Sequence, residues 1–145
     1  MGNVLDLNEL AKVSRLFEAL DAHGRNALLS LSHRIKVPAG GVICREGDPG
    51  GELFVIAKGE VRVSVDALAG EKEGARLGHG QFFGEMAVLN GDRRTATCAA
   101  VTEVELVAFP SASVEKILAK YPAAREALHK VGVLRSEDTM QKILD

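Results

Sequence analysis

The hydrophobic residues follow a helical period at both ends of the chain and a strand-like period between them. Near the N-terminus, apolar residues recur at three- and four-residue steps, as they do on one face of an amphipathic helix. These residues are Leu7, Leu10, Val13, Leu16, Phe17 and Leu20. Asp21 follows them and is a suitable N-cap for a second helix. That helix contains Leu28, Leu29 and Leu31, which we expect to face the core. The pattern predicts a helical section over about residues 4–33.

Between about residues 34 and 110, short runs of Val, Ile and Phe are separated by Gly, Pro and Asp, which is typical of strands joined by turns. Leu53–Ile56 is continuously apolar, and Val61–Val65 alternates as a half-buried strand does. Gly59 predicts a tight turn that links these two strands. The Gly-, Ala- and charge-rich segment at 67–75 reads as an exposed hairpin tip. Short strands at near-regular spacing predict a barrel or jelly roll.

The last section, over about residues 111–144, returns to a helical pattern. Either Ser111 or Ser113 is placed to cap a short helix, and Glu115 suits the positive end of its dipole. Pro122 then predicts the start of a final helix, because proline is favoured at the first helical position and the residue before it avoids helical conformation. The prediction is therefore helix, strands and helix in that order.

The composition describes an ordinary globular chain of 145 residues, 46% hydrophobic and 26% charged. This length predicts a single domain, 1–145, that buries about 68–70% of its unfolded surface without a disulfide or metal. A net charge of −2 gives no general attraction to nucleic acid. We see no apolar run near the roughly 20 residues that span a bilayer, and no secretory signal pattern. The expected location is the cytoplasm, with neither membrane nor nucleic acid as a partner.

The cysteines and histidines show no spacing typical of a metal site. Cys44 and Cys98 fall in predicted strands, and we interpret them as two reduced structural thiols. The four histidines are scattered, and His79 is the only one in the central strand region. A barrel enzyme of the cupin type needs several histidines and an acid around a metal, so the chain is not expected to be an enzyme.

The segment Phe83–Cys98 contains the residue types that hold a small sugar phosphate. Gly84 allows the backbone to approach an anion, because it has no side chain. The residues after it read as helix, whose first N–H groups are free to bind a phosphate. Arg94 can present a planar fork to the same phosphate, and Thr95 can add a hydroxyl donor. A phosphate would repel Glu85, so this carboxylate is better suited to accept hydrogen bonds from sugar hydroxyls.

This segment resembles the phosphate-binding cassette of the cyclic nucleotide-binding domain family. Two upstream segments are also similar to the family: Pro38–Asp48 to its early strand pair and turn, and Glu52–Val63 to its next hairpin. Together the resemblance covers about Leu16 to Tyr121. It implies an α+β, mainly β, fold: an antiparallel β-roll like a jelly-roll barrel, flanked by N-terminal helices and a C-terminal lid helix.

The resemblance also implies roles for individual residues. Arg94 would neutralise the cyclic phosphate, and Glu85 would accept a hydrogen bond from the ribose 2′-hydroxyl. The remaining cassette residues would complete the phosphate cradle: Phe83, Gly84, Met86, Ala87, Thr95 and Ala96. The purine would rest on apolar strand residues, for which Val61, Val63 and Leu77 are candidates from their pattern alone.

Two details of the ligand site stay open. Thr95 is similar to positions that contact the guanine amino group in cyclic GMP-binding relatives, yet it also occurs in domains that bind cyclic AMP; we favour cyclic AMP. Arg135 lies near the family's lid position and could stack on the purine. Leu134 and Val133 are competing apolar lids, and Arg135 as a solvated residue at a helix end is an equal alternative.

The function that the resemblance implies is a regulatory sensor whose C-terminal helix moves when a cyclic nucleotide, cyclic AMP or cyclic GMP, binds. The effector that reads this movement is an unknown protein or domain, and homodimerisation is left open. The chain is expected to be either a stand-alone sensor or a fragment of a longer protein. The alternative is a degenerate domain of the same fold that acts as a docking or dimerisation module.

Overall fold

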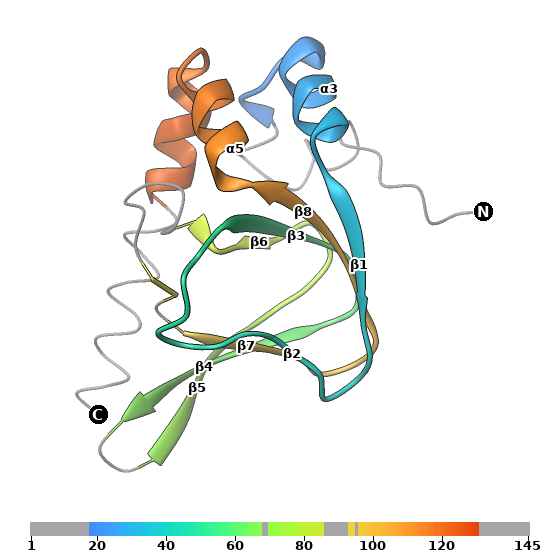
Figure 1. Cartoon of the computed structure of the whole chain (residues 1–145), viewed down its shortest axis with the longest axis vertical. Helices are drawn as coiled ribbons and strands as arrows, with labels where there is room; N and C mark the ends of the chain where they lie inside the picture. The colour runs from blue at the N-terminus through green and yellow to red at the C-terminus, as the bar shows by residue number, and fades with distance from the viewer. Residues whose placement is uncertain (1–17, 68–69, 86–92, 95, 131–145) are drawn as a thin grey trace.

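A computed structural model of the chain describes residues 18–67, 70–85, 93–94 and 96–130. Two four-stranded antiparallel sheets face each other, with helices on the outer side of the first sheet (Figure 1). The first sheet has the strand order β1 (His33–Val37), β8 (Val104–Pro110), β3 (Glu52–Lys58) and β6 (Phe82–Phe83). The second has the order β2 (Val42–Cys44), β7 (Thr97–Ala100), β4 (Val61–Ala67) and β5 (Gly70–Leu77). The predicted β-roll with flanking helices is confirmed.

The predicted hairpin between β3 and β4 is wrong, because these strands lie in different sheets. β3 pairs with β8 and β6, whereas β4 pairs with β5 and β7. Gly59 carries the chain from one sheet to the other with φ 97°. A Cβ at Gly59 would overlap the Glu103 carbonyl oxygen, so a side chain is excluded there. The strands β1 and β2 also separate, one into each sheet, instead of pairing across the turn before Gly41.

The hairpin that the chain does form joins β4 and β5. Its ladder runs from Val61 opposite Leu77 to Ala67 opposite Gly70, so most of the segment predicted as an exposed tip is strand. The register shifts between Val63 and Ser64. This bulge interrupts the alternation predicted for β4, and Ser64 and the next residue, Val65, are both buried.

Helix α3 (Ala22–Ser30) begins as predicted, since the Asp21 carboxylate accepts a hydrogen bond from the Gly24 N–H at 2.8 Å. Of the three leucines predicted to face the core, only Leu28 does, and Leu31 is the C-cap residue just after the helix. Leu28 is 1% exposed, whereas Leu29 and Leu31 are 41% and 46% exposed. The prediction for the last two is wrong because successive helical residues are rotated by about 100°, and α3 contacts the protein on one side only.

Helix α5 (Ser111–Leu118) follows β8 directly, and Pro110 occupies the N-cap without a side-chain hydrogen bond. The predicted serine cap is therefore wrong, and Glu115 lies beyond the first turn. Ser111 instead donates its backbone N–H to the Gly51 carbonyl at 2.9 Å, which joins the helix start to the beginning of β3. Pro122 opens a further helix, as predicted, which the structure describes over 122–130.

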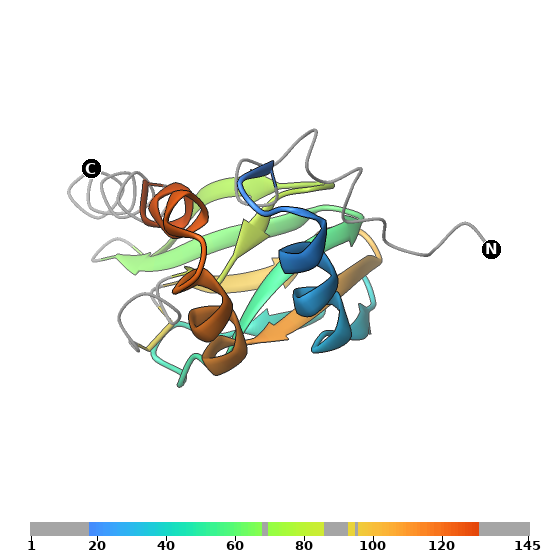
Figure 2. The same cartoon turned by 90° about the horizontal axis from the view of Figure 1, so that it is seen from above.

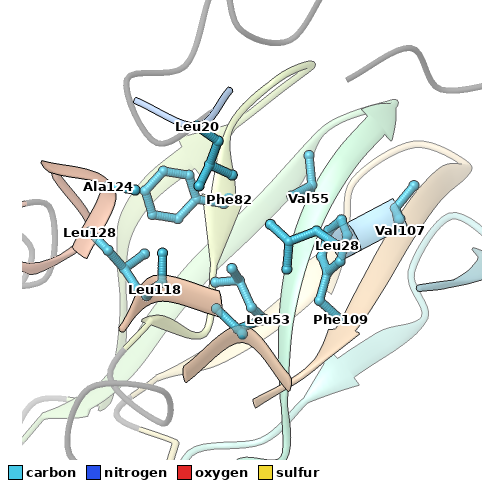
Figure 3. Packing of buried hydrophobic residues seen from close by; sticks show 11 residues of the cluster. Leu20, Leu28, Leu53, Val55, Phe82, Val107, Phe109, Leu118, Ala124 and Leu128 are labelled. Carbon is cyan, nitrogen blue, oxygen red and sulfur yellow. The ribbon is translucent and has the colours of Figure 1, made fainter. Parts of the chain in front are cut away.

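The helices cover the first sheet and bury one of two apolar clusters. Figure 2 shows α3 and α5 side by side on the sheet, and the two helices contact each other. Figure 3 shows this cluster, in which Leu28 of α3 and Leu118 of α5 pack with Leu53, Val55 and Phe109 of the strands, and with Leu20, Ala124 and Leu128 from the segments beside these helices. In the parts of the chain that the structure describes, no helix is long and apolar enough to cross a membrane.

The second cluster fills the space between the sheets. Phe54 and Ile56 belong to it, whereas Leu53 and Val55 of the same strand belong to the helix-covered cluster. Since side chains alternate along a strand, both faces of β3 are buried, which explains its continuous apolar run. The helix-covered cluster packs the helices onto the first sheet. The inner cluster contains Phe54 and Phe83, which belong to the site described below.

We predict that Leu28→Ala and Leu29→Ala differ strongly in stability although they are neighbours on one helix. Leu28→Ala removes a fully buried side chain, so the free energy of unfolding should fall by about 2–5 kcal/mol. Leu29→Ala removes an exposed side chain and should change it by no more than about 0.5 kcal/mol. Urea unfolding followed by circular dichroism measures both, and equal losses would contradict the assignment of the buried face.

Candidate functional site

The site lies where the β2–β7 pairing continues beyond the two strands. The Gly47 N–H donates to the Arg94 carbonyl at 2.9 Å, and the Arg94 N–H donates to the Asp48 carbonyl at 2.7 Å. An isolated bridge between Pro49 and Arg93 extends this pairing further. These backbone bonds fix the position of Arg94, whereas its neighbour Arg93 is exposed and donates to the Gly47 carbonyl.

The guanidinium of Arg94 is buried, with 9% of the residue exposed. Its Nη2 donates to the Glu52 carbonyl oxygen at 3.0 Å, and its central carbon lies 5.3 Å from the centre of the Phe54 ring. Nε and Nη1 have no hydrogen-bond partner among the residues that the structure describes. Burial of a charged group with unused donors is costly, so two N–H groups of this guanidinium are available to an anion.

Gly84 lies directly against this guanidinium. It has φ 89°, a region that only glycine enters readily. A Cβ at Gly84 would overlap Arg94 Nη1 and would lie 2.8 Å from the Glu52 carbonyl oxygen. The position therefore needs glycine for its conformation and for the space that Arg94 occupies. The predicted approach of its backbone to an anion stays a prediction.

The structure brings several other predicted residues to the same place. Phe83 is 3% exposed on β6, and its ring stacks on Phe54 with 5.0 Å between centroids, beneath Arg94. Glu85 is 4% exposed and helical, which puts a buried carboxyl group next in the chain to Gly84. Ala96 is half-buried in a bend before β7. Other predicted site residues lie outside the described residues: Met86, Ala87, Thr95 and Arg135, together with the alternative lids Val133 and Leu134.

The residues predicted to support the purine lie in the second sheet. Val61 and Leu77 are opposite each other on β4 and β5, with 0% and 6% of their surface exposed. Val63 is half-buried and packs against the same inner cluster. That cluster also contains Phe54 and Phe83, so the apolar residues and the arginine site share one interior.

Sequence reasoning missed two groups that hold Arg94. One is the Glu52 carbonyl, which leaves no side-chain signal. The other is Phe54, whose apolar character was recognised but whose face of β3 was not, because a continuous apolar run does not show which residues point inward. Within the described residues, no group of three or more histidine, cysteine or acidic side chains could hold a metal ion.

Comparisons with known proteins agree with this geometry. The family described as "Cyclic nucleotide-binding domain" matches residues 34–121. A cyclic nucleotide-gated potassium channel of Rhizobium etli is 35% identical over 130 residues, which cover 88% of this chain and 34% of the channel. The chain thus spans about a third of the length of this relative.

Two solved structures are also similar. The catabolite activator protein of Thermus thermophilus has a TM-score of 0.76 and 32% identity, over 90% of this chain and 63% of that protein. The regulatory domain of Toxoplasma gondii PKA, crystallised with cAMP, has a TM-score of 0.73 and 29% identity, over 77% of this chain and 42% of the other.

We predict that Gly84→Ala destabilises the protein more than Gly40→Ala does. Both glycines have positive φ, 89° and 85°, so both substitutions introduce backbone strain of about 1–3 kcal/mol. Around Gly40 there is no heavy atom within 4 Å of the added Cβ, whereas at Gly84 the Cβ meets Arg94. The excess loss in Gly84→Ala, measured by urea unfolding, therefore reports the clash. Equal losses would show that backbone and guanidinium are not in close contact.

Proposed function

The chain belongs to the cyclic nucleotide-binding domain family, and we propose that Arg94 binds the phosphate of a 3′,5′-cyclic nucleotide. The observation that carries this assignment is the buried guanidinium with two unused donors. A phosphodiester supplies the negative charge and the acceptor oxygens that this group lacks. The inferred activity is regulatory binding without catalysis.

The remaining phosphate contacts would come from the backbone around Gly84. Because Gly84 has no side chain, its backbone lies directly against Arg94, so one anion could contact both. We assign the cradle to the N–H groups of Gly84, Glu85, Met86 and Ala87, with the Thr95 hydroxyl and the Ala96 N–H on the opposite side. Helix N-terminal N–H groups bind phosphate because they have no partner within the helix.

Glu85 would select the sugar. A buried carboxylate beside a phosphate is repelled by it, so its acceptor oxygens suit a neutral donor, the ribose 2′-hydroxyl. This contact would distinguish a cyclic ribonucleotide from its deoxy analogue and from inorganic phosphate. The resemblance to the wider family supports the same role.

The purine would contact the apolar residues of the second sheet, Val61, Val63 and Leu77. Val63 is the half-buried member, and it gives the base an accessible edge next to the buried pair. We propose cyclic AMP as the preferred ligand over cyclic GMP. The similarity to a PKA regulatory domain crystallised with cAMP supports this preference.

The helix that begins at Pro122 would carry the response, with Arg135 as the residue that covers the base. Just before this helix, the Tyr121 hydroxyl donates to the Asp21 carboxylate at 2.8 Å. The ring of Tyr121 also fills the space where Gly24 would carry a side chain. Tyr121 thus joins the start of the last helix to α3, and this contact would transmit a change in helix position to the N-terminal section. An effector protein or domain would read the change.

We predict that cyclic AMP binds to the protein and stabilises it against heat, and that Arg94→Ala abolishes both effects. Loss of a desolvated charge-assisted contact costs about 2–5 kcal/mol, which is about thirtyfold or more in Kd. Calorimetric titration with cyclic AMP and cyclic GMP measures the affinities, and thermal unfolding measures the stabilisation.

Arg93→Ala is the matched control, because Arg93 is adjacent in sequence but exposed. It should retain wild-type affinity. Binding that survives in Arg94→Ala would contradict the site, and absence of binding by the wild-type protein to either nucleotide would favour the docking or dimerisation module. Tighter binding of cyclic GMP would overturn the proposed preference.

We also predict that Glu85→Gln weakens cyclic AMP binding but leaves binding of 2′-deoxy cyclic AMP unchanged. A hydrogen bond to a charged acceptor contributes about 1.5–3 kcal/mol, so the wild-type protein should bind the deoxy analogue at least about tenfold more weakly. Titration of both ligands into both proteins forms a double-mutant cycle. Equal weakening of both ligands would show that Glu85 does not contact the 2′-hydroxyl.

A further inference from the structure

Two cysteines that are 54 positions apart in the sequence face each other beside the arginine site. Cys44 on β2 is paired with Cys98 on β7, and both are free thiols. Opposite residues of antiparallel strands have Cα atoms about 4.5–5.5 Å apart. The register shifts between Val42 and Cys44, yet Cys44 and Cys98 stay paired. A disulfide accepts Cα separations of about 4.4–6.8 Å, a range that includes the spacing of a regular pair.

The two thiols differ in exposure and in acidity. Cys44 is partly exposed, and the hydrogen bond from the Cys98 thiol lowers its pKa to about 7 against the effect of burial, with help from the charge of Arg94. Cys98 is buried, and its hydrogen bond to Cys44 and its desolvation raise its pKa. Asp48 opposes the shift at Cys44, and Glu85 adds to the shift at Cys98. At neutral pH, about half of Cys44 is therefore thiolate, whereas Cys98 stays protonated.

The same backbone pairing connects this pair to Arg94. From the cysteine rung, the pairing continues through the Glu46 N–H, which donates to Thr97 Oγ1 at 3.0 Å, to the bonds between Gly47, Asp48 and Arg94. Cys98 also lies in the inner cluster with Phe54, over which the guanidinium is placed. The cysteines and the unused donors of Arg94 thus share one buried region.

We propose that Cys44 and Cys98 form a peroxide-sensitive dithiol, and that an anion bound at Arg94 slows its oxidation. The first part stands independently of ligand binding. The second part rests on the proposed function, because it requires a nucleotide phosphate beside Arg94.

The chemistry needs only a hydroperoxide, such as hydrogen peroxide, as the oxidant. The Cys44 thiolate attacks one peroxide oxygen, the O–O bond breaks, and hydroxide leaves, which gives a sulfenic acid on Cys44. The Cys98 sulfur then attacks Cys44 Sγ, the S–O bond breaks, and the Cys98 proton leaves with the hydroxyl group as water. The two sulfurs lose two electrons in total, and the peroxide is reduced to one hydroxide ion and one water molecule. The hydroxide takes up the proton that Cys44 released on ionising, which makes the second water.

The coupling between anion binding and cysteine oxidation follows from Arg94, because its positive charge would act on both Cys44 and the bound anion. Without ligand, the charge of Arg94 favours the Cys44 thiolate. A phosphate beside Arg94 neutralises that charge and adds a negative one, so the Cys44 pKa rises and less thiolate is present at neutral pH. A rise of about one unit from about 7 would reduce the thiolate fraction at pH 7, and the oxidation rate, about fivefold.

The test uses the full, reduced chain and hydrogen peroxide, with and without saturating cyclic AMP. Samples are quenched with an alkylating agent and analysed by peptide mass spectrometry. We expect an internal disulfide between the Cys44 and Cys98 peptides, an oxidation rate that rises as pH increases through about 7, and about fivefold slower oxidation with cyclic AMP. Either the absence of this internal disulfide or a rate independent of pH between about 6 and about 8 would overturn the dithiol, because that range brackets the Cys44 pKa of about 7.

Variants separate the roles of the residues. In Cys98→Ser, Cys44 should accumulate a sulfenic acid that dimedone traps, whereas Cys44→Ser should lose rapid oxidation. Arg94→Ala should oxidise more slowly than wild type and should not respond to cyclic AMP, and Arg93→Ala should behave as wild type. If Cys44→Ser oxidises as fast as wild type, the assignment of the reactive thiol is wrong.

A calorimetric titration on the same samples distinguishes the two proposals. If cyclic AMP binds but does not slow disulfide formation, the coupling is wrong and the proposed function is unaffected. If cyclic AMP does not bind, the proposed function fails and the coupling fails with it, whereas the disulfide analysis still decides whether the dithiol exists.

Discussion

The site depends on one desolvated cation that its surroundings only partly satisfy. Arg94 is held by the Glu52 carbonyl and the face of Phe54, while Nε and Nη1 have no hydrogen-bond partner in the described part of the chain. A fold tolerates such a group when packing fixes it in place and an external anion can accept its unused hydrogen bonds. In the proposed function, the guanidinium would be ordered before the ligand arrives, so less of the binding energy would be needed to order it.

The β-roll topology is what brings these groups together. Glu52 and Phe54 lie on β3 of the first sheet, Gly84 follows β6 of the same sheet, and Arg94 precedes β7 of the second. The site is thus at the seam between two sheets. Because consecutive strands pass to opposite sheets at turns such as Gly59, segments distant in sequence meet at this seam. The helices on the outer side stabilise β3 without reaching the guanidinium, so the supporting core and the site occupy opposite faces of one strand.

Features that depend on neighbouring residues could be predicted from the sequence, and features that depend on distant ones could not. Asp21 caps α3 and Pro122 opens a helix as predicted, because capping and proline geometry act within one turn. Gly84 and Arg94 were found through a motif and do lie in contact. The pairing of β3 with β8 and of Cys44 with Cys98 depends on long-range strand register. Hydrophobic periodicity carries no information about this register. Periodicity gave strands but not their partners, so it wrongly suggested a hairpin at Gly59.

The charge of Arg94 acts on Cys44, and both Arg94 and Glu85 act on Cys98, so the phosphate that we propose would enter a field already shared by these groups. Coupling between sites is reciprocal, so any phosphate that raises the Cys44 pKa must itself bind more weakly when that thiol is ionised. Disulfide formation removes the thiolate for as long as the bond stays oxidised, and with it this repulsion. Oxidation would then favour the anion-bound form, while the bound anion opposes oxidation kinetically. These two effects are compatible. The preference for the anion-bound form is an equilibrium property of the oxidised protein, whereas the slowing by the anion concerns the rate at which the reduced protein becomes oxidised.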